Sequence, residues 1–391
     1  MEQLKTLRLA RGYSLDELAA RIGGLVSKQM LSKYETGKSR PSLEVAQALA
    51  SALGVKVTAL YEAPAYDLEF IAYRKLSGLT KGSQGSMQAF LGEELRQRLD
   101  VQQRLGLHCE FQFLRREVAT QQDIEDQADA LRQKWGLGLE PIGNLMDVLE
   151  RKGVHVVNVS AAPGKFHGIS AVARTQGEFC GAMIAYREVD AGERQRSTLA
   201  HELGHLLLKV SGDLDEEKAV QSFAGAFLMP RALMFETLGR KRSNIHISEL
   251  LTWKAFFGTS MQAILYRAKT LEIISETYFK EWIIAISRQG WRKAEPRPLP
   301  TEQPRYWPQL VQRAVAEAAI TAQEANRLIP GIVPEPEVGT LNRRALLRLA
   351  PEKRRALLEE QASAVAELYQ PGSNHTEWVD DQGDEDILDA Y

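Results

Sequence analysis

Residues 197–209 read Ser-Thr-Leu-Ala-His-Glu-Leu-Gly-His-Leu-Leu-Leu-Lys and contain the pattern His-Glu-x-x-His at His201, Glu202 and His205. Residues four apart lie on the same face of a helix, so two imidazoles at this spacing can hold one zinc ion. The Glu beside the first His can act as a base on a water activated by the metal. The alternative interpretation is that both histidines are buried and hydrogen-bonded and bind no metal. Chance produces this sequence pattern in roughly one chain per hundred of this length. The pattern therefore predicts a zinc site.

The residues around this motif predict a helix that packs through one flank. Ser197 is a candidate N-cap and Gly212 a candidate C-terminal stop. Apolar residues recur between them at helical spacing: Leu199, Leu203, Leu206 and Val210. This flank can be buried while the histidine side faces a cleft.

A catalytic zinc site needs a third protein ligand and one open coordination position. An acidic turn, residues 213–217, follows the motif and leads into an apolar periodic run that ends at Pro230. Glu217 lies at the start of this second predicted helix, where it can supply a carboxylate. Glu216 and Asp215 are rivals that the sequence does not separate.

Length and composition are those of a soluble protein of two or three domains. The 391 residues include 49 Lys and Arg against 51 Asp and Glu, so the net charge is close to neutral. No apolar run approaches the length of a membrane span, which predicts no membrane partner. Cys109 and Cys180 are the only cysteines. They predict a reducing, cytoplasmic location and exclude a cysteine-based zinc site.

Residues 1–64 predict four short helices in the layout of a helix-turn-helix DNA reader. A capping box, Ser14 to Glu17, opens the second helix, and Ser27 caps the third, 28–35. Pro41-Ser42 opens the fourth.

The third helix and the turn after it carry the candidate DNA contacts, which are Ser27, Lys28, Gln29, Ser32, Lys33, Lys38 and Arg40. Gln29 has the donor and acceptor pair that suits adenine, whereas the Lys and Arg side chains suit phosphates. An ordinary solvated basic face is the alternative interpretation.

Ser-Lys-Tyr-Glu-Thr-Gly-Lys-Ser-Arg-Pro-Ser at 32–42 resembles the XRE (lambda-repressor-like) family. The resemblance implies a homodimer that binds a near-palindromic DNA duplex. Residues 23–27 look longer than the usual turn of this family, so the register of the base contacts stays open.

A second resemblance covers residues 124–275. Its motifs are Trp135-Gly136-Leu137-Gly138, the stretch 198–208 around His-Glu-x-x-His, and Leu228-Met229-Pro230, and together they resemble the ImmA/IrrE family of metallopeptidases. The resemblance implies a gluzincin-like Zn²⁺ site with His201, His205 and Glu217 as ligands and Glu202 as the catalytic base. Ala219-Val220-Gln221 replaces the usual Glu-Ala-Asn of the family and removes a nearby carboxylate.

The predicted fold class is α+β, mostly helical, with a small sheet before the motif helix from strands at 154–159, 168–174 and 181–186. The predicted domains are a DNA-binding head at 1–64, a helical connector at 65–123 with a break at 78–85, and a zincin-like domain at 124–275. A helical C-terminal region at 276–370 follows, with a Pro-rich linker at 296–304 and helices at 309–327 and 341–368. Residues 371–391 predict an acidic disordered tail, or else a decoy that competes with DNA for the basic head.

These features predict a cytoplasmic transcriptional regulator that binds double-stranded DNA and cleaves a repressor or partner protein through a zinc-dependent endopeptidase domain. The alternative is a non-catalytic repressor, or the antitoxin of a toxin–antitoxin pair, in which the zincin domain is structural or binds a partner such as a toxin.

Overall fold

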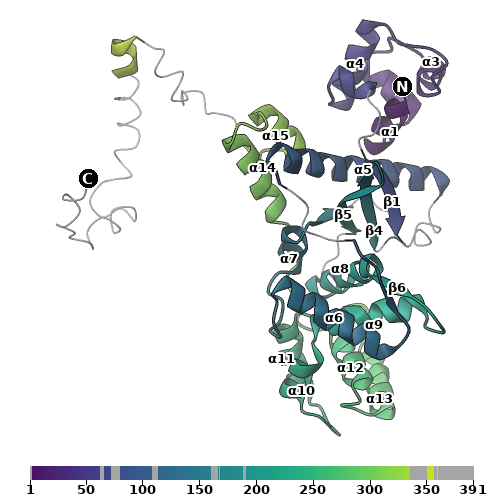
Figure 1. Cartoon of the computed structure of the whole chain (residues 1–391), viewed down its shortest axis with the longest axis vertical. Coiled ribbons are helices and arrows are strands. Elements are labelled where there is room, and N and C mark those ends of the chain that lie inside the picture. Colours follow the sequence, from purple (N-terminus) through teal and green to yellow (C-terminus); the bar gives the residue numbers. More distant parts are fainter. Residues whose placement is uncertain are drawn as a thin grey trace. The chain divides into compact units, whose positions relative to one another are not determined.

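The computed structural model describes residues 2–61, 66–71, 80–107, 113–159, 166, 168–187, 191–334, 350–355 and 359 (Figure 1). The chain divides into two units, residues 1–332 and 333–391, and every helix and strand named below lies in the first. The fold is α+β and mostly helical, which confirms the predicted class. The predicted acidic tail at 371–391 lies outside the described residues, as does most of the predicted helix at 341–368.

The head is built from α1 (Glu2–Ala10), α2 (Leu15–Arg21), α3 (Lys28–Glu35), α4 (Leu43–Leu53) and the short 3-10 helix η1 (Val57–Leu60). The side chains of Ser14, Ser27 and Ser42 cap α2, α3 and α4, as the sequence predicts. Leucines on the inner faces of these elements form one core: Leu4, Leu18, Leu31, Leu49 and Leu60.

The main sheet has the strand order β1-β4-β5-β3, from β1 (Asp67–Ile71), β3 (Val154–Asn158), β4 (Gly168–Thr175) and β5 (Glu178–Tyr186). β4 is antiparallel to both β1 and β5, whereas β3 is parallel to β5. Alternate side chains of the sheet enter two different cores. One core includes α5 (Lys81–Arg104), and the other includes α8 (Gly192–Leu207), so the two helices cover opposite faces (Figure 1).

The interval 65–123 is not a purely helical connector. Residues 67–71 form β1 and join the main sheet, and α5 runs through two of the glycines that predict a break. A Cβ atom on Gly92 of α5 would lie 2.7 Å from Leu68 Cδ1, so that glycine makes room for β1. β2 (Arg116–Val118) then pairs in parallel with β6 (Leu208–Val210). Such long-range pairings leave no signal within the interval itself.

The described first unit contains nine further α-helices. They are α6 (Gln121–Trp135), α7 (Leu145–Arg151), α9 (Glu216–Leu228), α10 (Arg231–Leu238), α11 (Ile247–Phe257), α12 (Met261–Thr270), α13 (Glu276–Arg288), α14 (Tyr306–Ala316) and α15 (Ala322–Leu328). The predicted helix at 309–327 is therefore two helices, because the chain turns between α14 and α15. Within the described residues, no helix has the length and apolarity that crossing a membrane requires.

The bounds of α8 differ from the predicted ones. The helix begins at Gly192, so Ser197 lies inside it and is not its N-cap. It ends at Leu207, where the chain enters β6, so Gly212 is not its stop. Both ends of α8 are fixed by segments distant in sequence, which explains why local signals misplace them.

The Pro-rich segment 296–304 packs on α8 and is not a free linker. Gly192 N donates to Leu299 O at 2.9 Å, and a Cβ on Gly192 would lie only 2.0 Å from Pro300 O. The carboxylate of Glu302 forms an ion pair with Arg196 and accepts from Met146 N at 2.8 Å. We call residues 299–302 the strap.

Candidate metal centre and DNA-binding surface

Helix α8 places His201 and His205 one turn apart on the same side. Their ring centroids are 5.0 Å apart and their planes are inclined by 74°. His205 is buried, with 1% of its side chain exposed, whereas His201 is 17% exposed. The pair therefore lies at the boundary between the core of the domain and solvent.

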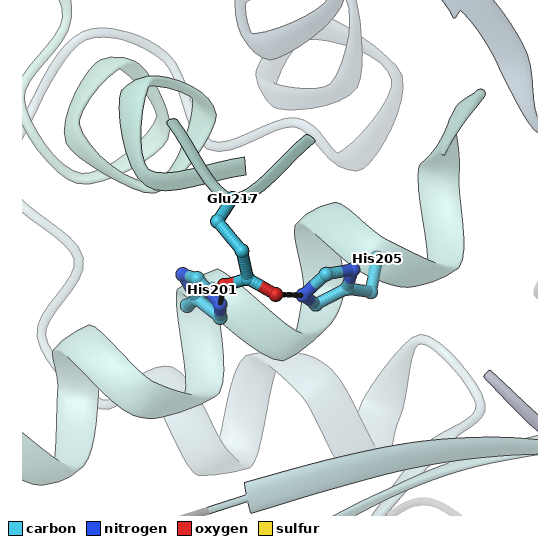
Figure 2. A group of neighbouring side chains, drawn as sticks. All are labelled: His201, His205 and Glu217. Carbon is cyan, nitrogen blue, oxygen red and sulfur yellow. Dashed lines mark ion pairs between the residues drawn. The ribbon is translucent and has the colours of Figure 1, made fainter. Parts of the chain in front are cut away.

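Glu217 in the first turn of α9 points at both imidazoles (Figure 2). Its Oε2 lies 3.2 Å from His201 Nε2, and its Oε1 lies 3.6 Å from His205 Nε2. One ligand atom from each of the three residues lies within 4.8 Å of the others. The residues that the sequence proposes as metal ligands are thus brought together by two helices.

The two rival carboxylates are placed differently. Asp215 is the N-cap of α9, and its Oδ1 accepts from Lys218 N at 2.9 Å. Glu216 contacts His205, with its Oε1 3.6 Å from Nδ1. Since Glu217 contacts both rings, the geometry favours it as the third ligand.

A glycine inside α8 allows α9 to approach. A Cβ on Gly204 would lie 2.8 Å from Val220 Cγ1 and 3.1 Å from Phe223 Cδ1. Any larger residue would push α9, and Glu217 with it, away from the histidines. Sequence reasoning missed this role, although a glycine within a helix costs about 1 kcal/mol relative to alanine and so indicates a close contact.

Glu202, on α8, lies against β4. It is 1% exposed, and Ser170 Oγ donates to its Oε2 at 3.4 Å. A Cβ on Gly168 would come within 3.0 Å of Glu202 Cγ, so the first residue of β4 also touches this side chain. Ser170 and Gly168 carry no motif that would single them out in the sequence.

The donor set suits zinc. Two imidazole nitrogens and a carboxylate oxygen are the ligands of many catalytic zinc sites. A tetrahedral ion with bonds of about 2.1 Å holds its ligand atoms roughly 3.4 Å apart. The distances of 3.2 and 3.6 Å between Glu217 and the imidazoles are close to that separation.

The proposed DNA contacts lie on the open side of the head. All seven are exposed: Ser27, Lys28, Gln29, Ser32, Lys33, Lys38 and Arg40. Ser27 also caps α3, and Lys28 Nζ lies 3.1 Å from the carboxylate of Asp16. Tyr34 on the opposite side of α3 is buried in the core of the head. α3 therefore presents a polar, basic face to solvent.

Comparison with protein families identifies both domains. A family model described as helix-turn-helix matches residues 4–60. A model described as IrrE N-terminal-like domain, from a family of metallopeptidases, matches residues 149–269. No curated protein and no solved structure matches the chain. The predicted fusion of an XRE-type head with an ImmA/IrrE-type domain is confirmed, and the chain joins a DNA-binding domain to a peptidase-like domain.

Proposed function

We propose that the chain is a cytoplasmic transcriptional regulator whose second domain is a zinc-dependent endopeptidase that cleaves a repressor or partner protein. The observation that supports this function best is the convergence of His201, His205 and Glu217, with Glu202 one residue from the first ligand. Zinc bound there supplies Lewis-acid polarisation of a peptide carbonyl and makes water a stronger acid. The head binds operator DNA as a homodimer.

Glu202 performs the proton transfers in this proposal. Its carboxylate takes a proton from the attacking water and delivers it to the amine of the leaving peptide. Ser170 holds one carboxylate oxygen, and burial restricts the side chain to a single environment. The carboxylate is therefore oriented before a substrate arrives.

The alternative function is a repressor or antitoxin with a structural metal. Structural zinc sites are closed by four protein ligands, whereas catalytic sites keep a position for water. The Glu217 side chain is 61% exposed, which leaves this side of the cluster accessible to solvent. This exposure favours turnover over a structural role.

The substitution Glu202→Gln tests the proposal because it keeps shape and removes the base. Zinc content and operator binding should match wild type, while cleavage falls by about 10²–10⁴-fold. The measurement is an immunoblot of the regulator encoded beside this gene, together with a reporter for its promoter. Glu236→Gln, an exposed carboxylate on α10, is the matched control. Identical blots and reporter output for wild type and Glu202→Gln would leave the DNA-binding module as the function.

A further inference from the structure

The sheet of the peptidase-like domain is completed by a strand from outside that domain. β1 begins at Asp67, directly after the head, whereas the family match begins at residue 149. β1 pairs in antiparallel register along one edge of β4, from Asp67 opposite Arg174 to Ile71 opposite Ser170. β5 occupies the other edge, so both edges of β4 are taken.

β4 is also the strand that touches the proposed base. Gly168 and Ser170 contact Glu202, and Ile71 is the register partner of Ser170. β1 therefore runs along β4 toward Glu202. Ile71 is buried in the same core as α8, whereas Leu68 and Phe70 pack on the α5 side.

An edge strand exposes a row of backbone donors and acceptors that can pair with an added extended peptide. If β1 were absent, a polypeptide bound along this edge of β4 would pass beside Ser170, whose side chain contacts Glu202. An endopeptidase can recognise a substrate in this way through its backbone, without requiring particular side chains. In the structure, β1 makes those backbone contacts instead.

We propose that β1 is an internal competitor of the substrate: an extended polypeptide pairs with the edge of β4 that faces β1, and binds only when β1 leaves it. The inference rests on the proposed endopeptidase function. The peptide runs in the direction of β1, antiparallel to β4, with its backbone paired and alternate side chains toward α8. Cleavage therefore requires that the segment following the DNA-binding head first moves.

β1 presents two of its five side chains to solvent. It is only five residues long, and Asp67 and Glu69 are exposed. The Glu69 carboxylate lies 3.7 Å from Arg174 Nε, in an ion pair open to water that contributes little. Within β1, the apolar contacts come from Leu68, Phe70 and Ile71, and Tyr66 just before it packs on the α5 side. A short strand with two exposed carboxylates is a weak occupant of a sheet edge.

A reversible cross-link tests the competition. Asp67→Cys and Arg174→Cys, which are register partners, lock β1 on β4 when oxidised, in a chain with both native cysteines changed to Ser and with Glu202→Gln. The probe is fluorescein-labelled casein, an unfolded polypeptide, and binding is read by fluorescence anisotropy. Oxidation should weaken binding at least about tenfold, because the competent state is removed, and dithiothreitol should restore it.

A second cross-link in the same sheet is the matched control. Thr175→Cys and Glu178→Cys are exposed register partners at the β4–β5 turn, where a disulfide leaves β1 free. Oxidation of this pair should not change casein binding.

Ile71→Asp removes the buried anchor of β1 and should tighten binding at least about tenfold by raising the competent fraction. Zinc content checks that each variant keeps its fold.

The outcomes separate this inference from the proposed function. Equal binding by the oxidised and reduced Asp67–Arg174 variant, or no casein binding in any state, overturns the competition. Binding that responds to the lock, combined with no cleavage when Glu202 is intact, refutes the endopeptidase and leaves β1 as the gate of a polypeptide-binding edge. Equal cleavage by locked and unlocked protein supports the endopeptidase and refutes the gate.

Discussion

The head and the metal centre are specified by contacts of different range. In the head, each cap and each core leucine lies within about 60 residues of its partners, and serine caps mark three helix starts. The metal centre depends on α8 and α9, on β4 beneath Glu202, and on the strap that binds α8 from about 100 residues downstream. The head should therefore tolerate changes that disrupt the centre, and the reverse should also hold.

The largest expected effect is loss of the metal. The wild-type protein purified without chelator should contain one zinc ion per chain, and His201→Ala should contain none. Glu217→Ala should bind zinc at least about tenfold more weakly. Metal analysis and competition with a chelating dye measure both. Full occupancy in the Glu217→Ala protein would transfer the third-ligand role to Glu216, while loss of operator binding in either variant would contradict the independence of the head.

The elements of the metal centre that have local sequence signals can be predicted from the sequence. The histidine spacing gives α8, and the acidic turn before an apolar run gives α9 with Glu217 at its start. The three strands nearest the motif also appear at the predicted positions, within a few residues. Preference for one of the three carboxylates needed the structure, because the packing of α9 on Gly204 brings Glu217 against both rings.

Sequence reasoning fails where a segment is held by distant partners. Prolines at 296–304 suggest a linker, yet the backbone of Leu299 and Glu302 pairs with Gly192 and Gln195. Glycines at 78–85 suggest a break, yet α5 passes through two of them. β1 is a short run whose strand partner lies about 100 residues away. Composition describes a segment alone and carries no information about such partners.

The next largest effect concerns the strap. Glu302→Ala leaves the Arg196 guanidinium, which is 5% exposed, without its carboxylate. Breaking a buried pair from one side costs about 3–5 kcal/mol of unfolding free energy. Glu317→Ala breaks an exposed pair with Arg313 and should change stability by less than about 0.5 kcal/mol. Urea unfolding of the full chain compares the two. Equal effects would show that the strap is dispensable for the fold of the centre.

A smaller effect is the pH dependence that comes from Glu150 on α7. Burial raises the pKa of its carboxyl to about 7, although Arg98 opposes the shift. Because the folded state holds this proton more tightly than the unfolded state, the stabilisation is present at low pH and is lost as pH rises from 4.5 to 7. The wild-type protein should therefore lose stability between pH 5 and 8. In Glu150→Gln this loss should be smaller by about 1–3 kcal/mol.

His155 makes stability depend on pH in the opposite direction from Glu150. Burial lowers the pKa of its imidazole to about 3, so its contribution is lost as pH falls below its usual value of 6.5. Urea unfolding across pH 5 to 8 gives the free energy of unfolding to which both residues contribute, with Glu317→Gln as an exposed control. If Glu150→Gln shows the same pH profile as wild type, the carboxyl is ionised throughout this range.

The smallest effects are in the head, and they separate positioning from base recognition. Lys38→Ala should weaken binding to every DNA sequence alike and lower the salt slope by about one, because it removes one phosphate contact. Gln29→Ala should cost about 1–3 kcal/mol at one base pair and relax preference there alone. Gel shifts on the gene's own promoter, and on variants of each half-site, measure both at several salt concentrations. The two residues are exposed on the same domain, so their folding effects should be equally small. A uniform loss from Gln29→Ala would instead place α3 against phosphates, with the long turn before it setting a different register. Unchanged zinc content in both variants would complete the comparison, because the head and the centre would then respond to separate sets of substitutions.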